Sequence, residues 1–239
     1  MSHTIIALHY WAGAGHEFDV LRPLLSPQMH LLAPDLPGFG RQPVPAGFDF
    51  SVRAYADWVA AYIRQQQVGE FTLLGHSMGG KITLSLAARQ PVSLRRLLLL
   101  APSPPTPEPM TDADRAAALA AYGDPEAAAQ TFAKITRQPL APALRTQTIS
   151  DSLCCSRAAW DAWMQLGSRE NIASQMPQLR VPCRLLVGAA DAAITPATQR
   201  DQTLPLLPAG TSLTVLPATG HLLPLEAPAA IAAMLNADW

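Results

Sequence analysis

The sequence of 239 residues is 49% hydrophobic and only 15% charged, a balance that excludes an intrinsically disordered chain. Lys and Arg number 17 against 18 Asp and Glu, so the formal net charge of −1 leaves no basic surplus to hold a nucleic-acid backbone. The length predicts one domain that carries an insertion, and we expect no nucleic acid among its partners.

The amino-terminal residues predict neither a secretion signal nor a membrane span. Residues 1–4 contain no Lys or Arg, and the apolar run 5–8 is too short for either element. Cys154, Cys155 and Cys183 lack C-x-x-C spacing, and two of them are adjacent, which favours free thiols in a reducing compartment. We therefore expect a cytoplasmic protein without a membrane partner.

Short apolar runs that alternate with helical patterns predict a doubly wound α/β sheet with right-handed crossovers. Continuous runs of this kind suit parallel strands that are covered on both faces. The predicted strands are residues 4–9, 30–33, 71–74, 97–100, 184–187 and 212–216. The second strand is short and ends at Pro34, so we place it at an exposed edge, where the chain either remains a monomer or pairs as a homodimer.

Helical patterns between these strands have recognisable ends. The predicted helices outside the insertion are residues 51–67, 79–89 and 226–235. Ser51 is a plausible N-cap for the first, Pro91 ends the second, and Pro228 lies in the first turn of the third, where proline is tolerated.

Residues 103–176, which we call the cap segment, contain no convincing strand. A run with five prolines at 102–109 leads into it and predicts a stiff, polyproline-like spacer. The predicted helices of the segment are residues 112–122, 125–136, 141–152 and 157–166. We expect residues 1–102 and 177–239 to form the core, and the cap segment to cover the sheet edge at which active sites form.

The sequence Gly75-His76-Ser77-Met78-Gly79 matches G-x-S-x-G between a predicted strand and a predicted helix. A sharp turn in that position presents the serine hydroxyl to a substrate and to a base, and glycines omit side chains that would collide with neighbouring elements. A tight glycine-rich turn without chemistry is the alternative. We predict that Ser77 is a catalytic nucleophile.

A serine hydroxyl needs a base to take its proton. Asp191 and His221 each follow a predicted strand, so both lie at the carboxyl edge where open α/β sheets bind ligands. With Ser77 they have the chain order nucleophile, acid, histidine. We predict that Asp191 holds the imidazole of His221 in its working tautomer and that His221 moves the proton. Alternatively, Asp191 only forms a turn and His221 only flanks a helix.

Other ionisable residues give weaker signals. Asp35 lies in a turn-like segment and Glu108 in the proline run, so both are poorer candidates for the acid. The remaining histidines lack metal-ligand spacing such as H-E-x-x-H, and we expect neither a metal nor a cofactor. We expect His9 to orient the loop after the first strand, His76 to support the turn at Ser77, and Lys81 to face solvent or the cap segment.

In combination these motifs resemble the α/β-hydrolase superfamily, in its small capped carboxylesterase-like branch. They are similar to those of biotin-pathway pimeloyl-ester carboxylesterases and of small bacterial acyl-ester and thioester hydrolases. The residues that carry the resemblance are LHYW at 8–11, PDLPGFG at 34–40, GHSMGGK at 75–81, GAAD at 188–191, GH at 220–221 and EAP at 226–228. They span nearly the whole chain outside the cap segment.

The resemblance implies an oxyanion hole made of the backbone N–H groups of Trp11 and Met78. The chain departs from the family at Tyr10, where Gly is usual. Its Cβ would strain the loop or tilt the Trp11 amide, or its hydroxyl would enter the pocket as a third donor. The family also usually begins with an antiparallel hairpin, for which the three residues before Thr4 leave no room, so we expect six strands, all parallel.

The resemblance implies hydrolysis of a carboxylic ester, a thioester or a lactone through an acyl-enzyme on Ser77. The near-neutral cap segment favours medium-sized, mostly apolar acyl groups. The residues expected to line the substrate pocket are Tyr10, Leu119, Tyr122, Phe132, Trp160, Trp163 and Met164. Relatives with the same fold and triad act as lyases, C–C bond hydrolases or perhydrolases, or as small-molecule receptors, and these remain alternatives.

Overall fold

The computed structural model describes residues 3–237, and within them six strands form one sheet in the order β2-β1-β3-β4-β5-β6. All neighbouring strands are parallel. The strands are β1 (His3–Leu8), β2 (Met29–Leu32), β3 (Phe71–His76), β4 (Leu94–Leu100), β5 (Cys183–Gly188) and β6 (Ser212–Leu216). The predicted fold class, the six strands and the edge position of β2 are confirmed.

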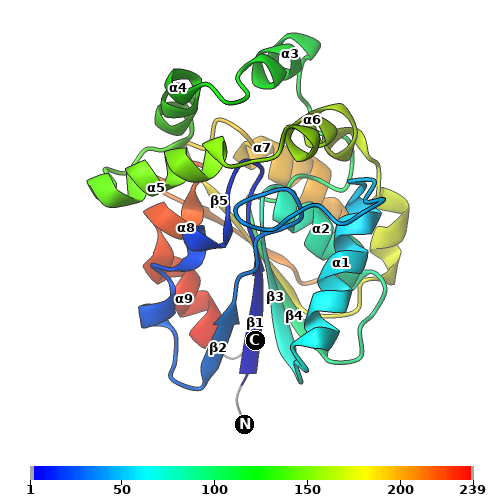
Figure 1. The fold of residues 1–239 in the computed structure, drawn as a ribbon. Helices are drawn as coiled ribbons and strands as arrows, with labels where there is room; N and C mark the ends of the chain where they lie inside the picture. Colours follow the sequence, from blue (N-terminus) through cyan, green and yellow to red (C-terminus); the bar gives the residue numbers. More distant parts are fainter. Residues whose placement is uncertain (1–2, 238–239) are drawn as a thin grey trace.

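The sheet separates two hydrophobic clusters, because successive side chains of a strand point to opposite faces. In β1, Ile6 and Leu8 belong to one cluster, whereas Ile5 and Ala7 belong to the other. Helices α1 (Val52–Gln65) and α2 (Met78–Ala87) cover the first face. Helices α8 (Leu223–Glu226) and α9 (Pro228–Asn236) cover the second face (Figure 1).

The helix ends follow local capping rules. Ser51 Oγ accepts a hydrogen bond of 3.0 Å from Ala54 N–H at the start of α1, as its position predicts. The predicted helix 226–235 needs correction, because α8 ends at Glu226 and Ala227 leaves helical geometry, with φ of −139°. Pro228 then begins α9, where its missing N–H costs no hydrogen bond.

The cap segment lies between β4 and β5 and above the carboxyl ends of the strands (Figure 1). Its helices are α3 (Asp112–Ala120), α4 (Pro125–Ile135), α5 (Pro142–Leu153) and α6 (Arg157–Gln165). Thr111, Asp124 and Ser156 cap the amino termini of α3, α4 and α6 with side-chain oxygens. These caps explain why separate short helices form instead of one long helix.

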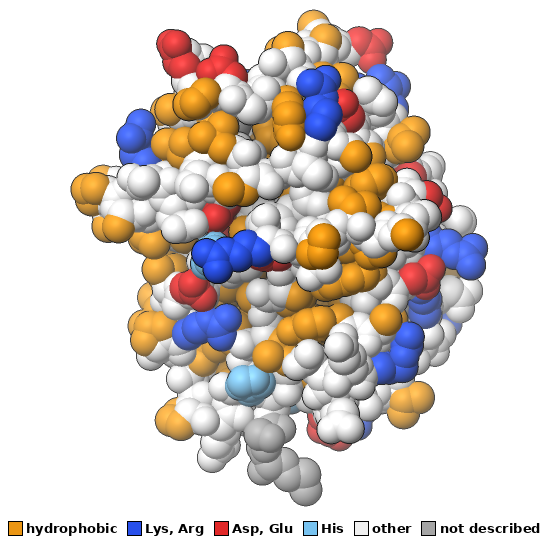
Figure 2. All heavy atoms as spheres, in the orientation of Figure 1, with side chains coloured by type: hydrophobic (Ala, Val, Ile, Leu, Met, Phe, Trp, Pro, Cys, Tyr) orange, Lys and Arg blue, Asp and Glu red, His pale blue; other side chains and the backbone are white. Residues whose placement is uncertain are grey.

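The surface carries charges of both signs scattered over the visible face rather than gathered in one patch (Figure 2). In residues 3–237, no helix combines the length and the apolar character that crossing a bilayer requires. The same residues contain no group of three or more His, Cys, Asp or Glu side chains placed to hold a metal ion.

Candidate active site

Ser77 occupies a strained turn between β3 and α2, with φ of 52° and ψ of −115°. Such backbone geometry is unfavourable for a residue with a Cβ and persists only where the surroundings enforce it. Ser77 N–H donates to Leu100 O at 3.0 Å, and Ser77 O accepts from Gly80 N–H and Ser103 N–H, both at 2.9 Å. The end of β4, the residues just after it and the first turn of α2 therefore hold the turn in place.

The two motif glycines allow α2 to approach the sheet closely. A Cβ on Gly79 would lie 2.2 Å from Leu8 O, and a Cβ on Gly75 would lie 2.6 Å from the Cα of Gly80. Both separations are shorter than any real contact, so a side chain at either position would push α2 away from β1 and β3. Ser77 would move with it, because it is the residue that precedes α2.

Asp191, after β5, and His221, after β6, form a buried pair in which His221 Nδ1 lies 2.7 Å from Asp191 Oδ2. The other carboxylate oxygen accepts from Ala193 N–H at 2.8 Å and Ile194 N–H at 2.9 Å. An ionised carboxylate only accepts hydrogen bonds, so Nδ1 carries the hydrogen. Nε2 of the neutral ring is then the nitrogen with a free lone pair, which is the one a general base needs.

The surroundings of His221 favour its protonated form. Burial alone lowers the pKa of an imidazole, but the charge and hydrogen bond of Asp191, with a further contribution from Glu108, outweigh it. The pKa of His221 therefore lies above its ordinary value of 6.5.

Behind His221 lies a second buried pair, Glu17 and His76. His76 Nε2 donates to His221 O at 2.8 Å, which leaves Nδ1 as the atom that faces both Glu17 oxygens at 3.1 Å. Burial lowers the pKa of His76 to about 3 and raises the pKa of Glu17 well above its ordinary value. A neutral imidazole and a protonated carboxyl group fit this geometry, with the Glu17 O–H donating to Nδ1.

His9 fixes the loop after β1. Its Nδ1 lies 2.7 Å from Tyr10 O and its Nε2 accepts from Leu36 N–H at 3.0 Å, so Nδ1 carries the hydrogen. Burial lowers the pKa of His9 to about 4, which keeps the ring neutral. The left-handed residue of this loop is Ala12, with φ of 66°, and not Tyr10, where we expected strain.

The two residues expected to supply oxyanion donors are Trp11, in the loop after β1, and Met78, which follows Ser77 directly at the start of α2. In residues 3–237, neither Trp11 N–H nor Met78 N–H donates a hydrogen bond to the protein. Met78 is the first residue of α2, where N–H groups have no partner within the helix. Both amides are therefore available as oxyanion donors.

A cavity of about 370 Å³ lies between this edge of the sheet and the cap segment. Ser77 and His221 both line it, together with Tyr10 and Trp11. The Tyr10 ring packs 5.4 Å from the His76 ring, and its hydroxyl has no hydrogen bond to any described residue. Of the pocket residues expected from the cap segment, the structure places Phe132, Trp160, Trp163 and Met164 in the lining.

Leu119 and Tyr122, also expected in the pocket, lie outside its lining. The Tyr122 hydroxyl donates to Cys155 O at 2.9 Å, and its ring packs edge-on against Trp160 at 5.6 Å between centroids. Leu119 packs against the hydrophobic core. Small side chains line the cavity instead, and the sequence did not single them out because they are not aromatic. They are Ala117, Ala118, Ala121 and Ala128.

Lys81 is fully buried, so the solvent-facing alternative expected for it is wrong, whereas its contact with Thr106 places it against the cap segment, the other alternative. Its Nζ donates to Thr106 O at 3.1 Å, because the proline-rich run that leads into the cap segment crosses over α2. Burial lowers the pKa of Lys81 to about 8, although Glu108 and Glu170 oppose that shift. Lys81 thus ties this run to the helix that follows Ser77.

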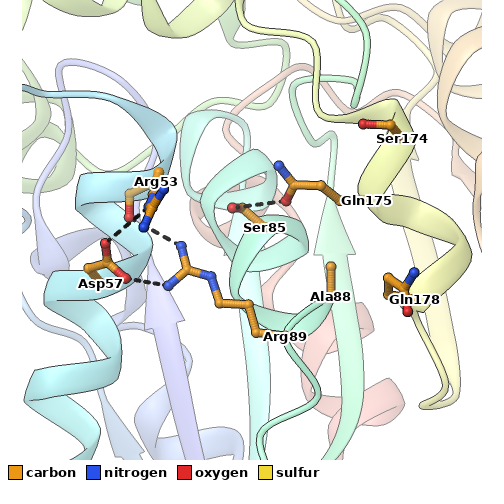
Figure 3. Close-up of a pocket in the computed structure, with 8 residues that line it drawn as sticks. All are labelled: Arg53, Asp57, Ser85, Ala88, Arg89, Ser174, Gln175 and Gln178. Atoms are coloured by element: carbon orange, nitrogen blue, oxygen red, sulfur yellow. Dashed lines mark hydrogen bonds and ion pairs between the residues drawn. The ribbon is translucent and has the colours of Figure 1, made fainter.

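Another hollow, of about 540 Å³, lies between α1, α2 and residues 174–178 (Figure 3). Its charged groups are already paired, since Asp57 contacts both Arg89 and Arg53. Ser85 Oγ donates to Gln175 Oε1 at 3.4 Å across the hollow. This lining offers no base for a serine, so the candidate active site is the cavity at Ser77.

Comparisons with known proteins agree with this geometry. The model of the alpha/beta hydrolase family matches residues 5–234. The chain is similar in fold to a bromoperoxidase from Bacillus anthracis, with a TM-score of 0.90, 13% identity, and coverage of 98% of this chain and 91% of that one.

Two curated relatives match part of the chain. A pimeloyl-[acyl-carrier protein] methyl ester esterase of Neisseria meningitidis serogroup C is 40% identical over 97 residues, which is 41% of this chain and 36% of the relative. The uncharacterized hydrolase YugF of Bacillus subtilis is 32% identical over 100 residues, which is 42% of this chain and 37% of the relative. The matched segments thus span little more than a third of the length of each relative.

Proposed function

The chain belongs to the alpha/beta hydrolase family, and from that premise we propose that it is a serine hydrolase that cleaves carboxylic esters of small to medium acyl groups. The observation that carries the proposal is the 2.7 Å hydrogen bond between Asp191 and His221 at the cavity that Ser77 also lines. The similarity to a relative named as a methyl ester esterase supports the same reaction class.

The reaction would proceed in two acyl-transfer steps. Ser77 Oγ attacks the carbonyl carbon while His221 Nε2 takes the hydroxyl proton, and the negative oxygen that forms is held by the N–H groups of Trp11 and Met78. The C–O bond of the ester then breaks, and His221 gives its proton to the leaving alcohol. Water activated by His221 attacks the acyl-enzyme, which releases the acid and restores Ser77.

We assign the choice of acyl group to the cap segment, residues 103–176. It supplies Trp160, Trp163 and Met164 and a row of alanines to the cavity, and these surfaces suit an apolar acyl chain. A thioester or a lactone carbonyl would meet the same groups, and a series of p-nitrophenyl esters of increasing acyl length would measure how much of the cavity an acyl chain uses.

The proposal is tested by labelling with a fluorophosphonate, which reacts with activated serines. We expect one adduct per chain, and peptide mass spectrometry should place it on Ser77. The inactive control is the Ser77→Ala variant, which should remain unlabelled. Labelling at another residue, or none in the folded wild-type protein, would refute the proposed mechanism.

The pH dependence of kcat/KM provides an independent check. Only neutral His221 accepts the Ser77 proton, so activity falls as pH drops through the pKa of His221. Because that pKa is raised, the midpoint of the acid limb should lie above 6.5. A midpoint at or below 6.5, measured from initial rates between pH 5 and 9, would contradict the assigned environment of His221.

A further inference from the structure

The end of α4 is hydrogen-bonded to the loop that carries His221. His221 N–H donates to Ile135 O at 2.7 Å, and Gln138 Nε2 donates to Ala218 O at 2.7 Å. The other backbone polar group of His221, its carbonyl oxygen, accepts from His76 Nε2 at 2.8 Å. The carbonyl oxygen also accepts from Leu223 N–H at 2.8 Å, so the backbone contacts of His221 reach the cap segment, the strand that precedes Ser77 and the start of α8.

Glu226 joins the same two segments through one carboxylate oxygen. Its Oε2 accepts from Arg137 N–H at 2.7 Å and Gln138 N–H at 2.9 Å, both in the cap segment. It also accepts from the N–H of Gly220, the residue that precedes His221, at 3.0 Å. Three backbone donors on the two segments thus share one acceptor atom.

The two segments approach so closely that residue 220 has no room for a side chain. A Cβ on Gly220 would lie 2.4 Å from Ile135 O and 2.8 Å from Glu226 Oε1. The second carboxylate oxygen, Oε1, is buried without a hydrogen-bond partner in the described residues. Burying a carboxylate oxygen in this way is costly, so the contacts of Oε2 have to offset it.

We propose that Glu226 is a positioning residue for His221. By binding amides of both segments, it holds the end of α4 and the loop 218–221 in a fixed position relative to each other. This inference rests on the proposed function, since it assumes that His221 is the general base. Asp191 sets the direction of the imidazole ring, whereas Glu226 sets the backbone from which the ring projects. Without Glu226, three amides on two segments lose their common acceptor, and one of the constraints on the backbone that carries His221 is lost.

The test compares Glu226→Ala with Asp124→Ala. Asp124 is the matched control, because its carboxylate also accepts two backbone N–H groups, at the opposite end of α4 and away from His221. We expect Glu226→Ala to slow fluorophosphonate labelling of Ser77 and to lower kcat by about 10- to 100-fold, with KM little changed, because small misplacements of a catalytic group have effects of this size. Asp124→Ala should react at the wild-type rate although its melting temperature falls.

Two milder variants separate positioning from a loss of folding. Glu226→Gln retains an oxygen that can accept the same three N–H groups, so it should recover most of the rate. The side chain of Glu226→Asp is an acid like that of Glu226 but is too short to reach both segments, so its kcat should be about tenfold lower. This variant takes the place of Glu226→Ala in the comparison if Glu226→Ala does not fold. Wild-type rates in Glu226→Asp or Glu226→Ala, or an equal loss in Asp124→Ala, would overturn the inference. Absence of labelling in the wild-type protein would instead refute the proposed function.

Discussion

Replacing Ser77 with Ala is expected to abolish ester hydrolysis, with a loss in kcat of about 10⁵- to 10⁶-fold, as when a serine nucleophile is removed in other hydrolases. The substitution removes the Oγ atom that, in the proposed reaction, attacks the carbonyl carbon and carries the acyl group. The fold should persist, because the Ser77 hydroxyl makes no hydrogen bond to a described residue and Ala has the same difficulty with a φ of 52°. Initial rates on a p-nitrophenyl ester and a thermal unfolding curve measure the two effects separately.

The matched control is Ser85→Ala. Ser85 is a buried serine on the same helix, and its hydroxyl contacts Gln175 instead of the cavity. This variant should keep wild-type kcat. Activity in Ser77→Ala close to that of Ser85→Ala would eliminate Ser77 as the nucleophile.

Replacing Asp191 with Asn should lower kcat by about 10⁴-fold, although the side chain keeps its shape. The Asn amide can donate to Nδ1 of His221, which favours the tautomer with its proton on Nε2 and removes the lone pair that the reaction needs. The substitution also removes the charge that raises the pKa of His221. The remaining activity should therefore reach its acid midpoint at a lower pH than the wild-type enzyme does.

Asp57→Asn serves as the control, since Asp57 pairs with Arg89 in the other hollow (Figure 3) and faces no group of the cavity. It should change neither kcat nor the pH midpoint. If Asp191→Asn lost less than tenfold in kcat, or shifted the midpoint upward, another acid would have to orient His221.

The sequence predicted the sheet and its helices because their signals are local. The apolar runs of β3 and of the second half of β4 are buried on both faces, and Ser51 caps α1 where a serine precedes the first helical turn. The G-x-S-x-G motif is local for the same reason, since its glycines are required by contacts with the adjacent strand and helix. The pairing of Asp191 with His221 followed from topology, because parallel strands bring their carboxyl ends to one edge.

The supporting residues of the site were not predictable in this way. Glu17 meets His76, and Glu226 meets Arg137 and Gln138, only after distant segments have packed together, and no spacing connects these positions. For Lys81 the sequence left a solvent-facing and a cap-facing position open, because nothing in its own helix indicates that the proline-rich run crosses above it and buries it. The same limit applies to Tyr122, since the sequence does not specify which face of its segment meets the cavity.

The order of the strands also determines when the site is assembled. Leu100 and Ser103, which hold the turn at Ser77, follow it closely in the chain, whereas β5 and β6 form the last part of the sheet. Chains fold from the amino terminus as they leave the ribosome. On the proposed assignment, a nascent chain that has not yet reached β5 carries the nucleophile without its acid or its base. Catalytic competence would then arise only once β5 and β6 have joined the edge of the sheet, and chains that have not reached these strands would not consume substrate.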